Sequence, residues 1–220
     1  MNLLVIGTEQ NLTECKAKFG DTHTYALADN YKEAGRLMET DTVIFDFLID
    51  EIPTEVTYYE DLNTVAFLNT TKRSLLDLTY GLLKSPKATL FGFNGLPTFL
   101  NRALLEVAVL RDEHKSVLEK TCQQLNTAFS LVEDRVGLVT PRIICMIINE
   151  AYFTVQEGTA TRADIDMAMK LGTNYPYGPF EWCKRIGIKN VYELLEAVYE
   201  DTKDERYKIC PLLKKEYLQQ

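Results

Sequence analysis

Short β-rich runs alternate with helical stretches through the first 130 residues, and this alternation constrains the fold more than any other feature. The apolar runs lie at residues 3–7, 22–27, 43–48, 65–69, 88–93, 104–110 and 129–132, and the helical stretches at 12–19, 31–38, 71–83 and 113–126. Parallel strands need crossover connections, which are usually helices, and such sheets are covered on both faces. We therefore expect an α/β N-terminal domain that is Rossmann-like, with a mostly parallel sheet.

From Gly137 onwards the pattern changes to apolar residues at helical spacing. A wide apolar stripe runs over residues 143–155 and stops at Gly158. Thr161 and Asp164 fit a capping box for a helix that continues to Lys170 and closes at Gly172. A turn-rich stretch around Pro176 and Pro179 follows, and residues 191–199 and 212–218 supply further helices. The pattern predicts an all-α C-terminal domain.

The charge divides at the same point. Residues 1–133 hold 19 acidic and 12 basic residues, whereas residues 134–220 are nearly balanced, so we expect domains at 1–133 and 134–220. The net charge of −8 argues against binding to nucleic acid or to an anionic membrane. No apolar run could span a bilayer, and the first residues have the pattern of a strand and not of a signal peptide.

The five cysteines indicate the compartment. They are odd in number, scattered, and contain no C-x-x-C pair. This spacing favours reduced thiols in a cytoplasmic protein over a disulfide framework or a zinc site, so we expect no bound metal.

The C-terminal half carries a specific set of motifs. They are DRVGLV at 134–139, ADIDMAMKLG at 163–172, YPYGPFE at 175–181 and CPLL at 210–213. This half resembles the C-terminal domain of the 3-hydroxyacyl-CoA dehydrogenases, including 3-hydroxybutyryl-CoA dehydrogenase. The resemblance implies a helical domain that forms most of a dimer interface, in an NAD-dependent enzyme of fatty acid metabolism.

The N-terminal half resembles the same family in order but less in chemistry. The segments VAFLNTT at 65–71, FGFNG at 91–95 and LLEV at 104–107 are similar to family segments in the same succession. The family's long helical insertion after its second strand, which helps to hold coenzyme A, has no counterpart, because about a dozen residues separate Asp29 from Asp41.

Hydride transfer needs a base on the substrate hydroxyl, and the family uses a histidine for it, oriented by a glutamate. The resemblance assigns the histidine position to Phe91, which cannot carry a proton. It assigns the glutamate to Glu106, although three extra residues separate Glu106 from Phe91. The family serine corresponds to Thr71, and the family asparagine corresponds to Pro141, which has no side-chain donor and no N–H.

The two histidines do not fill the gap. His23 lies in the second strand and His114 at the start of a helix, so neither occupies the family position. Both are more typical of surface or core filling than of catalysis.

The nucleotide motif is also altered. A dinucleotide fingerprint requires G-x-G-x-x-G, but the corresponding run is GTEQNL at 7–12. Only Gly7 remains as a cofactor-binding glycine, and Glu9 would sit where the pyrophosphate lies in the family. Asp29, at the end of the second strand, is the candidate ribose-binding acid.

Three hypotheses follow. In the first, the chain has lost ordinary dehydrogenase activity and acts as a binding or interaction subunit, a pseudoenzyme. In the second, it is an active NAD-dependent 3-hydroxyacyl-CoA dehydrogenase with a rearranged site. In the third, a different enzyme reuses the cleft with Glu106 and Thr71. An open turn at residues 7–12 with Glu9 pointing away would argue against the first.

The expected partners follow from the same features. The width of the 143–155 stripe, with the family resemblance, predicts a homodimer through the C-terminal domain. An acyl-CoA-type ligand is implied by the resemblance alone.

Overall fold

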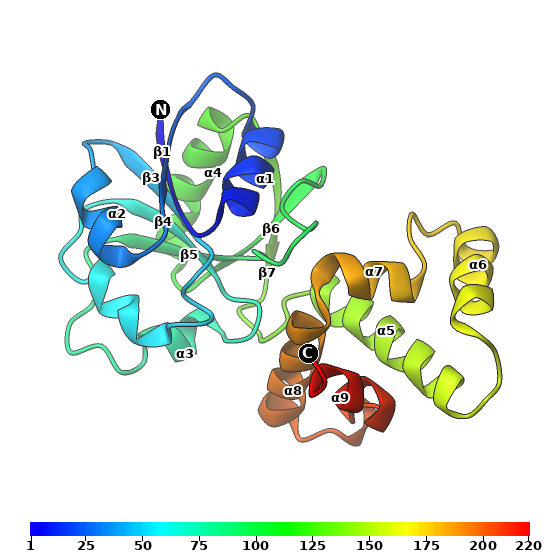
Figure 1. Ribbon diagram of the computed structural model, residues 1–220. Coiled ribbons are helices and arrows are strands. Elements are labelled where there is room, and N and C mark those ends of the chain that lie inside the picture. Colours follow the sequence, from blue (N-terminus) through cyan, green and yellow to red (C-terminus); the bar gives the residue numbers. More distant parts are fainter. The chain divides into compact units, whose positions relative to one another are not determined.

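A computed structural model describes residues 1–220 and divides the chain into two compact units, Met1–Leu138 and Val139–Gln220 (Figure 1). The division falls a few residues after the position expected from charge. No helix is long and apolar enough to cross a bilayer.

The first unit is an α/β unit built on seven strands. The strands are β1 (Asn2–Ile6), β2 (Thr24–Ala28), β3 (Thr42–Asp46), β4 (Val65–Asn69), β5 (Thr89–Phe93), β6 (Leu104–Val109) and β7 (Ala128–Val132). The helices are α1 (Glu9–Phe19), α2 (Tyr31–Leu37), α3 (Leu75–Thr79) and α4 (Lys115–Gln124), with 3-10 turns η1 (Pro53–Tyr59) and η2 (Asp112–His114).

The strands form one sheet in the order β2-β1-β3-β4-β5-β6-β7, and every neighbouring pair is parallel except β5 and β6. The predicted mostly parallel sheet is therefore confirmed. The connection between β5 and β6 contains no helix, and without a crossover the chain can only return antiparallel.

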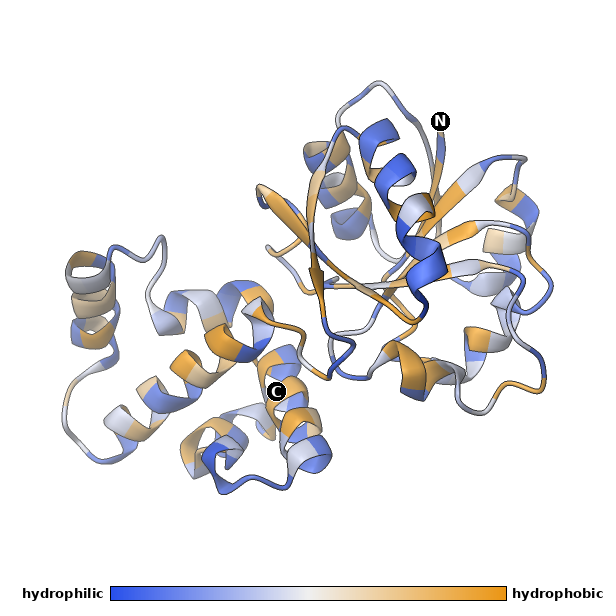
Figure 2. Ribbon diagram, turned by 180° about the vertical axis from the view of Figure 1, so that it is seen from behind, coloured by the Kyte–Doolittle hydropathy of each residue, from blue (hydrophilic) through white to orange (hydrophobic).

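Each face of the sheet has its own core, and Figure 2 shows hydrophobic residues along the strands between them. One core joins the strands to Phe19 of α1 and to Leu118 of α4. The other joins them to Ala34 of α2, Tyr59 of η1 and Leu75 of α3. Residues buried on both sides explain why these strands have continuous apolar sequences.

The helix predicted over residues 71–83 is much shorter than expected. Ser74 caps α3 by accepting the N–H of Asp77 at 3.0 Å, so the helix cannot begin before it. The helix ends at Thr79, and Leu83 lies in an exposed loop. The run of leucines has helical spacing, but beyond the helix Leu82 packs against the core from a loop and Leu83 is exposed.

The second unit contains helices only, as predicted. They are α5 (Thr140–Gln156), α6 (Arg162–Thr173), α7 (Pro179–Ile186), α8 (Ile188–Thr202) and α9 (Pro211–Tyr217), with the 3-10 turn η3 (Glu205–Tyr207). The predicted cap of α6 is present, since Thr161 accepts the N–H of Asp164. The helix passes Gly172 and ends at Asn174, whose φ of 56° forms a left-handed cap.

The stretch expected to be rich in turns contains a bend at Pro176, as predicted, but its second proline begins a helix. Pro179 is the first residue of α7, a position that needs no N–H donor. The Asp166 carboxylate of α6 accepts the N–H groups of Phe180 at 2.8 Å and Glu181 at 3.2 Å. Thus α6 and α7 are joined by a side chain that satisfies the start of the second helix.

Candidate functional site

The carboxyl ends of β1 to β5 lie along one edge of the first unit's sheet, because these five strands are parallel. Ligands of open α/β sheets bind at this edge. Of the predicted site residues, Gly7, Asp29 and Thr71 follow β1, β2 and β4 respectively, so the topology brings all three to it. Pro141 belongs to the other unit.

The turn between β1 and α1 is closed by its own side chains. Thr8 is the N-cap of α1, and its side chain accepts the N–H of Asn11 at 3.4 Å. In return, the Asn11 carboxamide oxygen accepts the N–H of Thr8 at 2.8 Å. This is a reciprocal capping box, with asparagine in the place usually held by glutamate or glutamine.

Asn11 also fills the space above Gly7. A Cβ added to Gly7 would lie 2.7 Å from the Asn11 Oδ1 atom. The Gly7 N–H is occupied as well, because it donates to the Ala28 carbonyl at 2.9 Å. A dinucleotide pyrophosphate needs free N–H groups and an open approach at this turn, so the turn as formed does not fit that group.

Glu9 is not the obstacle that the sequence suggested. It is the first residue of α1 and its side chain is exposed to solvent. The residue that closes the turn is Asn11, which sequence analysis missed. The spacing Thr8-x-x-Asn11 was the available signal, since it follows the capping-box pattern.

Asp29 stands beside this turn. It follows β2, and Ala28 is paired with Ile6 of β1. Its side chain is exposed and accepts a hydrogen bond from the Asn30 carboxamide. The Asn30 side chain also caps α2 by accepting the N–H of Glu33 at 2.9 Å. Asp29 therefore has the position of a ribose-binding acid, in a turn whose polar groups are already engaged.

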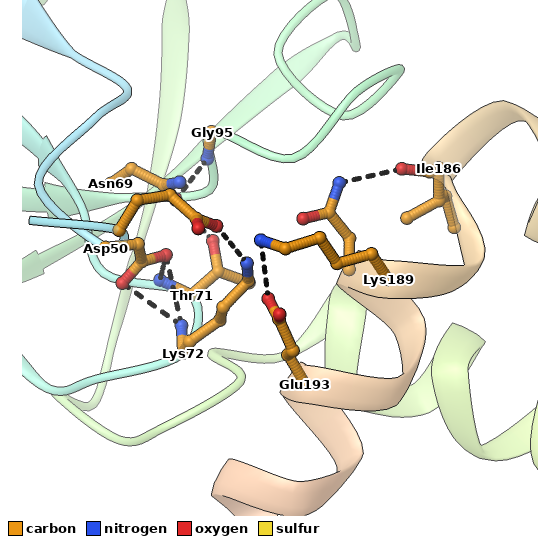
Figure 3. Close-up of polar contacts among 10 residues, drawn as sticks. Asp50, Asn69, Thr71, Lys72, Gly95, Ile186, Lys189 and Glu193 are labelled. Carbon is orange, nitrogen blue, oxygen red and sulfur yellow. Dashed lines mark hydrogen bonds and ion pairs between the residues drawn. The ribbon is translucent and has the colours of Figure 1, made fainter. Parts of the chain in front are cut away.

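Asp50 organises the end of β4 (Figure 3). Its carboxylate accepts the N–H of Thr71 at 3.1 Å and the N–H of Lys72 at 3.2 Å. Burial raises the pKa of Asp50 to about 7, and these N–H donors and the Lys72 charge reduce the shift. The Lys72 ammonium is 2.6 Å from Glu51. Lys72 is thus held in an ion pair.

Asn69 connects β4 to the loop after β5. Its carboxamide oxygen accepts the N–H of Gly95 at 3.0 Å and the hydroxyl of Thr71 (Figure 3). Thr71 is fully buried, so its hydroxyl proton is committed to Asn69. A Cβ on Gly95 would lie 2.7 Å from the Asn69 side chain, which fixes this loop closely against β4.

Phe91 does not lie at the ligand edge. It is in the middle of β5, fully buried, with its ring centroid 5.2 Å from that of Phe67. The residue that follows β5 is Asn94. Asn94 stands three residues after Phe91. The distance along the chain from Phe91 to Glu106 exceeds the family's histidine-to-glutamate spacing by three residues, so placing the family histidine at Asn94 would restore that spacing.

The strand pairing supports this assignment. Phe93 of β5 pairs with Val107 of β6 in antiparallel register, and Asn94 and Glu106 are the next residues beyond this last pair of the ladder. Phe93 and Val107 point into the core under α1 and α4, and alternation along β6 turns Glu106 to the other face of the sheet. Asn94 is buried, and its side chain accepts the N–H of Leu96 at 3.2 Å. An asparagine has no proton to exchange near neutral pH.

Sequence analysis also missed a buried carboxylate at the end of β3. Asp46 accepts the hydroxyls of Tyr31 at 2.9 Å and Tyr59 at 2.8 Å, together with two backbone N–H groups. Burial raises the pKa of Asp46 to about 6 despite these donors. An acid at the end of a buried strand was the only sequence signal. With four donors already bound, this carboxylate has a structural role.

The remaining predicted residues lie apart from the edge. Pro141 occupies the first turn of α5, where a missing N–H has no effect on the helix. His23 precedes β2, and burial lowers its pKa. His114 lies in η2. All five cysteines are buried free thiols.

Comparisons with known proteins find a family model that matches the second unit. Residues 137–219 match the model of the "3-hydroxyacyl-CoA dehydrogenase, C-terminal domain". A 3-hydroxyadipyl-CoA dehydrogenase of Escherichia coli is 41% identical over 96 residues, which are 44% of this chain and 20% of that protein. The chain matches about a fifth to a third of the length of such curated relatives.

Solved structures extend the likeness to both units. M. tuberculosis FadB2 gives a TM-score of 0.74 at 16% identity, covering 97% of this chain and 92% of that one. The (S)-3-hydroxybutyryl-CoA dehydrogenase PaaH1 of Ralstonia eutropha gives 0.69 at 19% identity, with the same coverage. At these identities the likeness concerns the fold alone, a Rossmann-like unit followed by a helical one.

Proposed function

We propose that this chain, whose residues 137–219 match the C-terminal domain of the 3-hydroxyacyl-CoA dehydrogenases, is a family member without ordinary dehydrogenase activity that serves as a binding or interaction subunit. Members of this family are NAD-dependent oxidoreductases. The proposal concerns what this chain does with the altered edge of its sheet.

The closed β1–α1 turn carries the proposal. The Asn11 side chain accepts the Thr8 N–H and lies against Gly7, where the pyrophosphate of a dinucleotide would approach. To bind NAD, the chain would have to break its own capping box and leave the Thr8 N–H without this acceptor. A capping interaction of this kind contributes about 1 kcal/mol, which would be subtracted from the binding free energy.

The pair at the end of β5 supports the same conclusion. Glu106 keeps the carboxylate that orients the base in the family, but the first residue after β5, one step beyond its last pair with β6, is Asn94. An asparagine can hold a carbonyl or hydroxyl by hydrogen bonding, yet it cannot remove a proton. Pro141 likewise lacks the donor that the family asparagine supplies. The edge therefore retains groups that could bind a ligand and lacks the group that would react with it.

The test is a titration of the full chain with NADH, followed by nicotinamide fluorescence. We expect no saturable binding up to about 1 mM NADH. A dissociation constant of about 1 mM corresponds to a binding free energy of only about 4 kcal/mol. An Asn11→Gly variant removes the side chain that closes the turn, and we expect it to bind NADH more tightly than the wild type. An Asn101→Gly variant, in the exposed loop before β6, is the matched control.

The alternative is an active NAD-dependent 3-hydroxyacyl-CoA dehydrogenase with a rearranged site. It is favoured by the adjacency of Gly7 and Asp29 at the ends of β1 and β2 and by the retention of Glu106. Micromolar NADH binding by the wild type, with turnover of acetoacetyl-CoA, would replace the first proposal with this one. A third possibility, a different reaction at Glu106 and Thr71, would require the Thr71 hydroxyl to leave Asn69.

We also propose that the chain forms a homodimer through its helical unit. The 12-residue helix α6 has no buried side chain and leaves Leu171 81% and Met167 57% exposed. Ile143 of α5 is likewise 54% exposed. Exposed apolar helix faces indicate an interaction surface, and a second copy supplies one. Sedimentation should give twice the mass of 25.2 kDa, and Leu171→Glu should yield the monomer.

A cytoplasmic location and an acyl-CoA-type ligand complete the proposal. The five buried free thiols agree with a reducing compartment. An acyl-CoA ligand rests on the family alone, and isothermal titration with acetoacetyl-CoA would test it.

A further inference from the structure

A groove of about 490 Å³ lies at the end of the first unit's sheet opposite the ligand edge. It is formed where β5 begins and β6 ends, since Phe91 of β5 pairs with Val109 of β6 in antiparallel register. The loop from α3 to β5 forms one wall. The groove is therefore separate from the turn at Gly7 and from the Asn94–Glu106 pair, which lie at the carboxyl end of β5.

Part of the groove lining is apolar and unusually exposed. Leu83 is 96% exposed, Leu76 is 60% exposed and Leu110 is 37% exposed, and all three line the groove. Figure 2 shows the hydrophobic character of α3, which contributes Leu76. Scattered exposed leucines are common, but several around one concavity mark a surface that gains from being covered.

The charged part of the lining is basic. Lys84, Lys87, Arg111 and His114 line the groove, and no acidic residue does. This is a local reversal of charge, because residues 1–133 contain 19 acidic against 12 basic residues. A concavity lined by one sign of charge concentrates ligands of the opposite sign.

The ion pairs of these cations do not block a ligand. The Lys87 ammonium is 3.0 Å from Asp61, and both side chains are largely exposed. Arg111 is 3.5 Å from Glu113 in an equally exposed pair. Exposed pairs of this kind are worth little, so either cation can turn to an incoming anion.

From these observations we infer that the groove binds a small amphiphile, an apolar chain that carries an anionic head group. The chain would cover Leu76, Leu83 and Leu110, and the head group would meet Lys84 and Lys87. The volume lies in the range of small-ligand pockets, which favours a small molecule over a macromolecule. The groove would bind such a ligand whether or not the opposite edge binds NAD.

The test uses dodecanoate as the probe, titrated into the full chain by calorimetry below its micelle concentration. Dodecanol provides the same chain without the charge. The informative variant is the charge reversal Lys84→Glu with Lys87→Glu. The matched control is Lys32→Glu with Arg36→Glu, which makes the same change of charge on the exposed face of α2.

We expect saturable binding of one dodecanoate, weakened by about tenfold in the Lys84/Lys87 variant and unchanged in the control. Leu83→Asp, at a position with almost no contacts to lose in folding, should weaken binding by a similar factor. Dodecanol should bind at least about tenfold more weakly than dodecanoate. Circular dichroism of each variant verifies that the fold is kept.

Two sources of the anion are distinguished by competition. Displacement of dodecanoate by dodecanoyl-CoA, with the same loss in the Lys84/Lys87 variant, would identify CoA phosphates as the head group. Failure of dodecanoyl-CoA to compete would identify a free carboxylate. The inference is overturned if dodecanoate does not saturate, if dodecanol binds equally well, or if the charge reversal has no effect. NADH titration of the same variants separates this outcome from that of the proposed function.

Discussion

The N-termini of α1 and α7 can be compared, because at both of them side chains of the protein itself accept the first N–H groups of the helix. The first N–H groups of any helix require acceptors, which can come from a side chain or from a ligand. At α7 the acceptor is Asp166, and at α1 it is Thr8, with Asn11 completing the box. In both cases a glycine makes room for the capping side chain.

The difference lies in what the cap replaces. At α7 the cap joins two helices of a unit whose sequence matches the family closely. At α1 the cap occupies the turn that a Rossmann-like fold otherwise offers to a pyrophosphate. The helical unit matches the family model over residues 137–219, whereas in the α/β unit the turn at the ligand edge is closed by its own side chains. Packing depends on many apolar positions, whereas binding depends on a few polar ones.

The largest expected effect is that of Gly178→Ala. A Cβ at this position would lie 2.3 Å from the Asp166 carboxylate, so the cap of α7 must break or the turn must move. We expect the free energy of unfolding of the second unit to fall by about 3 kcal/mol, because the variant both creates a steric clash and removes the cap of α7. Trp182, the only tryptophan, lies in α7 and reports this unit by fluorescence.

Gly172→Ala is the matched control for that measurement. Gly172 is in α6, and nothing lies within 4 Å of a Cβ added there. Alanine favours a helix over glycine by about 1 kcal/mol, so this variant should be neutral or more stable. Equal losses in the two variants would contradict the crowding argument.

Asp166→Ala should have the next largest effect. It leaves the N–H groups of Phe180 and Glu181 without their acceptor but creates no clash. We expect a loss of about 1–2 kcal/mol in denaturant unfolding followed at Trp182. Asp166→Asn should recover part of it, because a carboxamide oxygen still accepts one N–H. A loss as large as that of Gly178→Ala would mean that Asp166 does more than cap.

Asn11→Ala tests the corresponding cap of α1. Removing the carboxamide leaves the Thr8 N–H without its acceptor in the folded state, although solvent can reach the turn. We expect a loss of about 1 kcal/mol, measured by hydrogen exchange at the β1 amides. Gln10→Ala, on the exposed side of the same helix, should change stability by less than about 0.5 kcal/mol. No difference between the two variants would show that the box contributes nothing.

The strands could be predicted because they are buried on both faces and therefore have continuous apolar sequences. The end of the helix expected over 71–83 could not be predicted. Leu82 and Leu83 have helical spacing, but in the structure both line the groove beyond the end of α3. The start of α7 was missed because Pro176 and Pro179 suggest turns, and Pro179 serves as a first helical residue instead.

The candidate site was predictable only as far as topology determines it. Parallel strands bring Gly7, Asp29 and Thr71 to one edge, and their order in the sequence is enough to show this. The resemblance assigned the family histidine to Phe91, which lies in the middle of β5 and not at the ligand edge. Closure of the turn by Asn11 depends on a side-chain conformation, which residue identity alone does not determine.

The smallest expected effect is a dependence of stability on pH that belongs to the α/β unit. The pKa of Asp50 is raised from 3.8 to about 7 and that of Asp46 to about 6, in both cases by burial. A carboxyl group whose pKa is higher in the folded state binds protons more tightly there than when unfolded. Its contribution is therefore favourable at low pH and is lost as the pH rises through 6 and 7.

Asp50→Asn removes one of these titrations. Between pH 6 and 7 we expect the wild type to lose about 0.5 kcal/mol more stability than the variant, as hydrogen exchange at the β4 amides would measure. The limiting slope for one group is about 1.4 kcal/mol per pH unit, and partial exposure of Asp50 reduces it. The exposed Asp21→Asn should leave the slope as it is in the wild type. Equal slopes in the wild type and the Asp50 variant would contradict this expectation and mean that the wild-type carboxylate is ionised throughout this range.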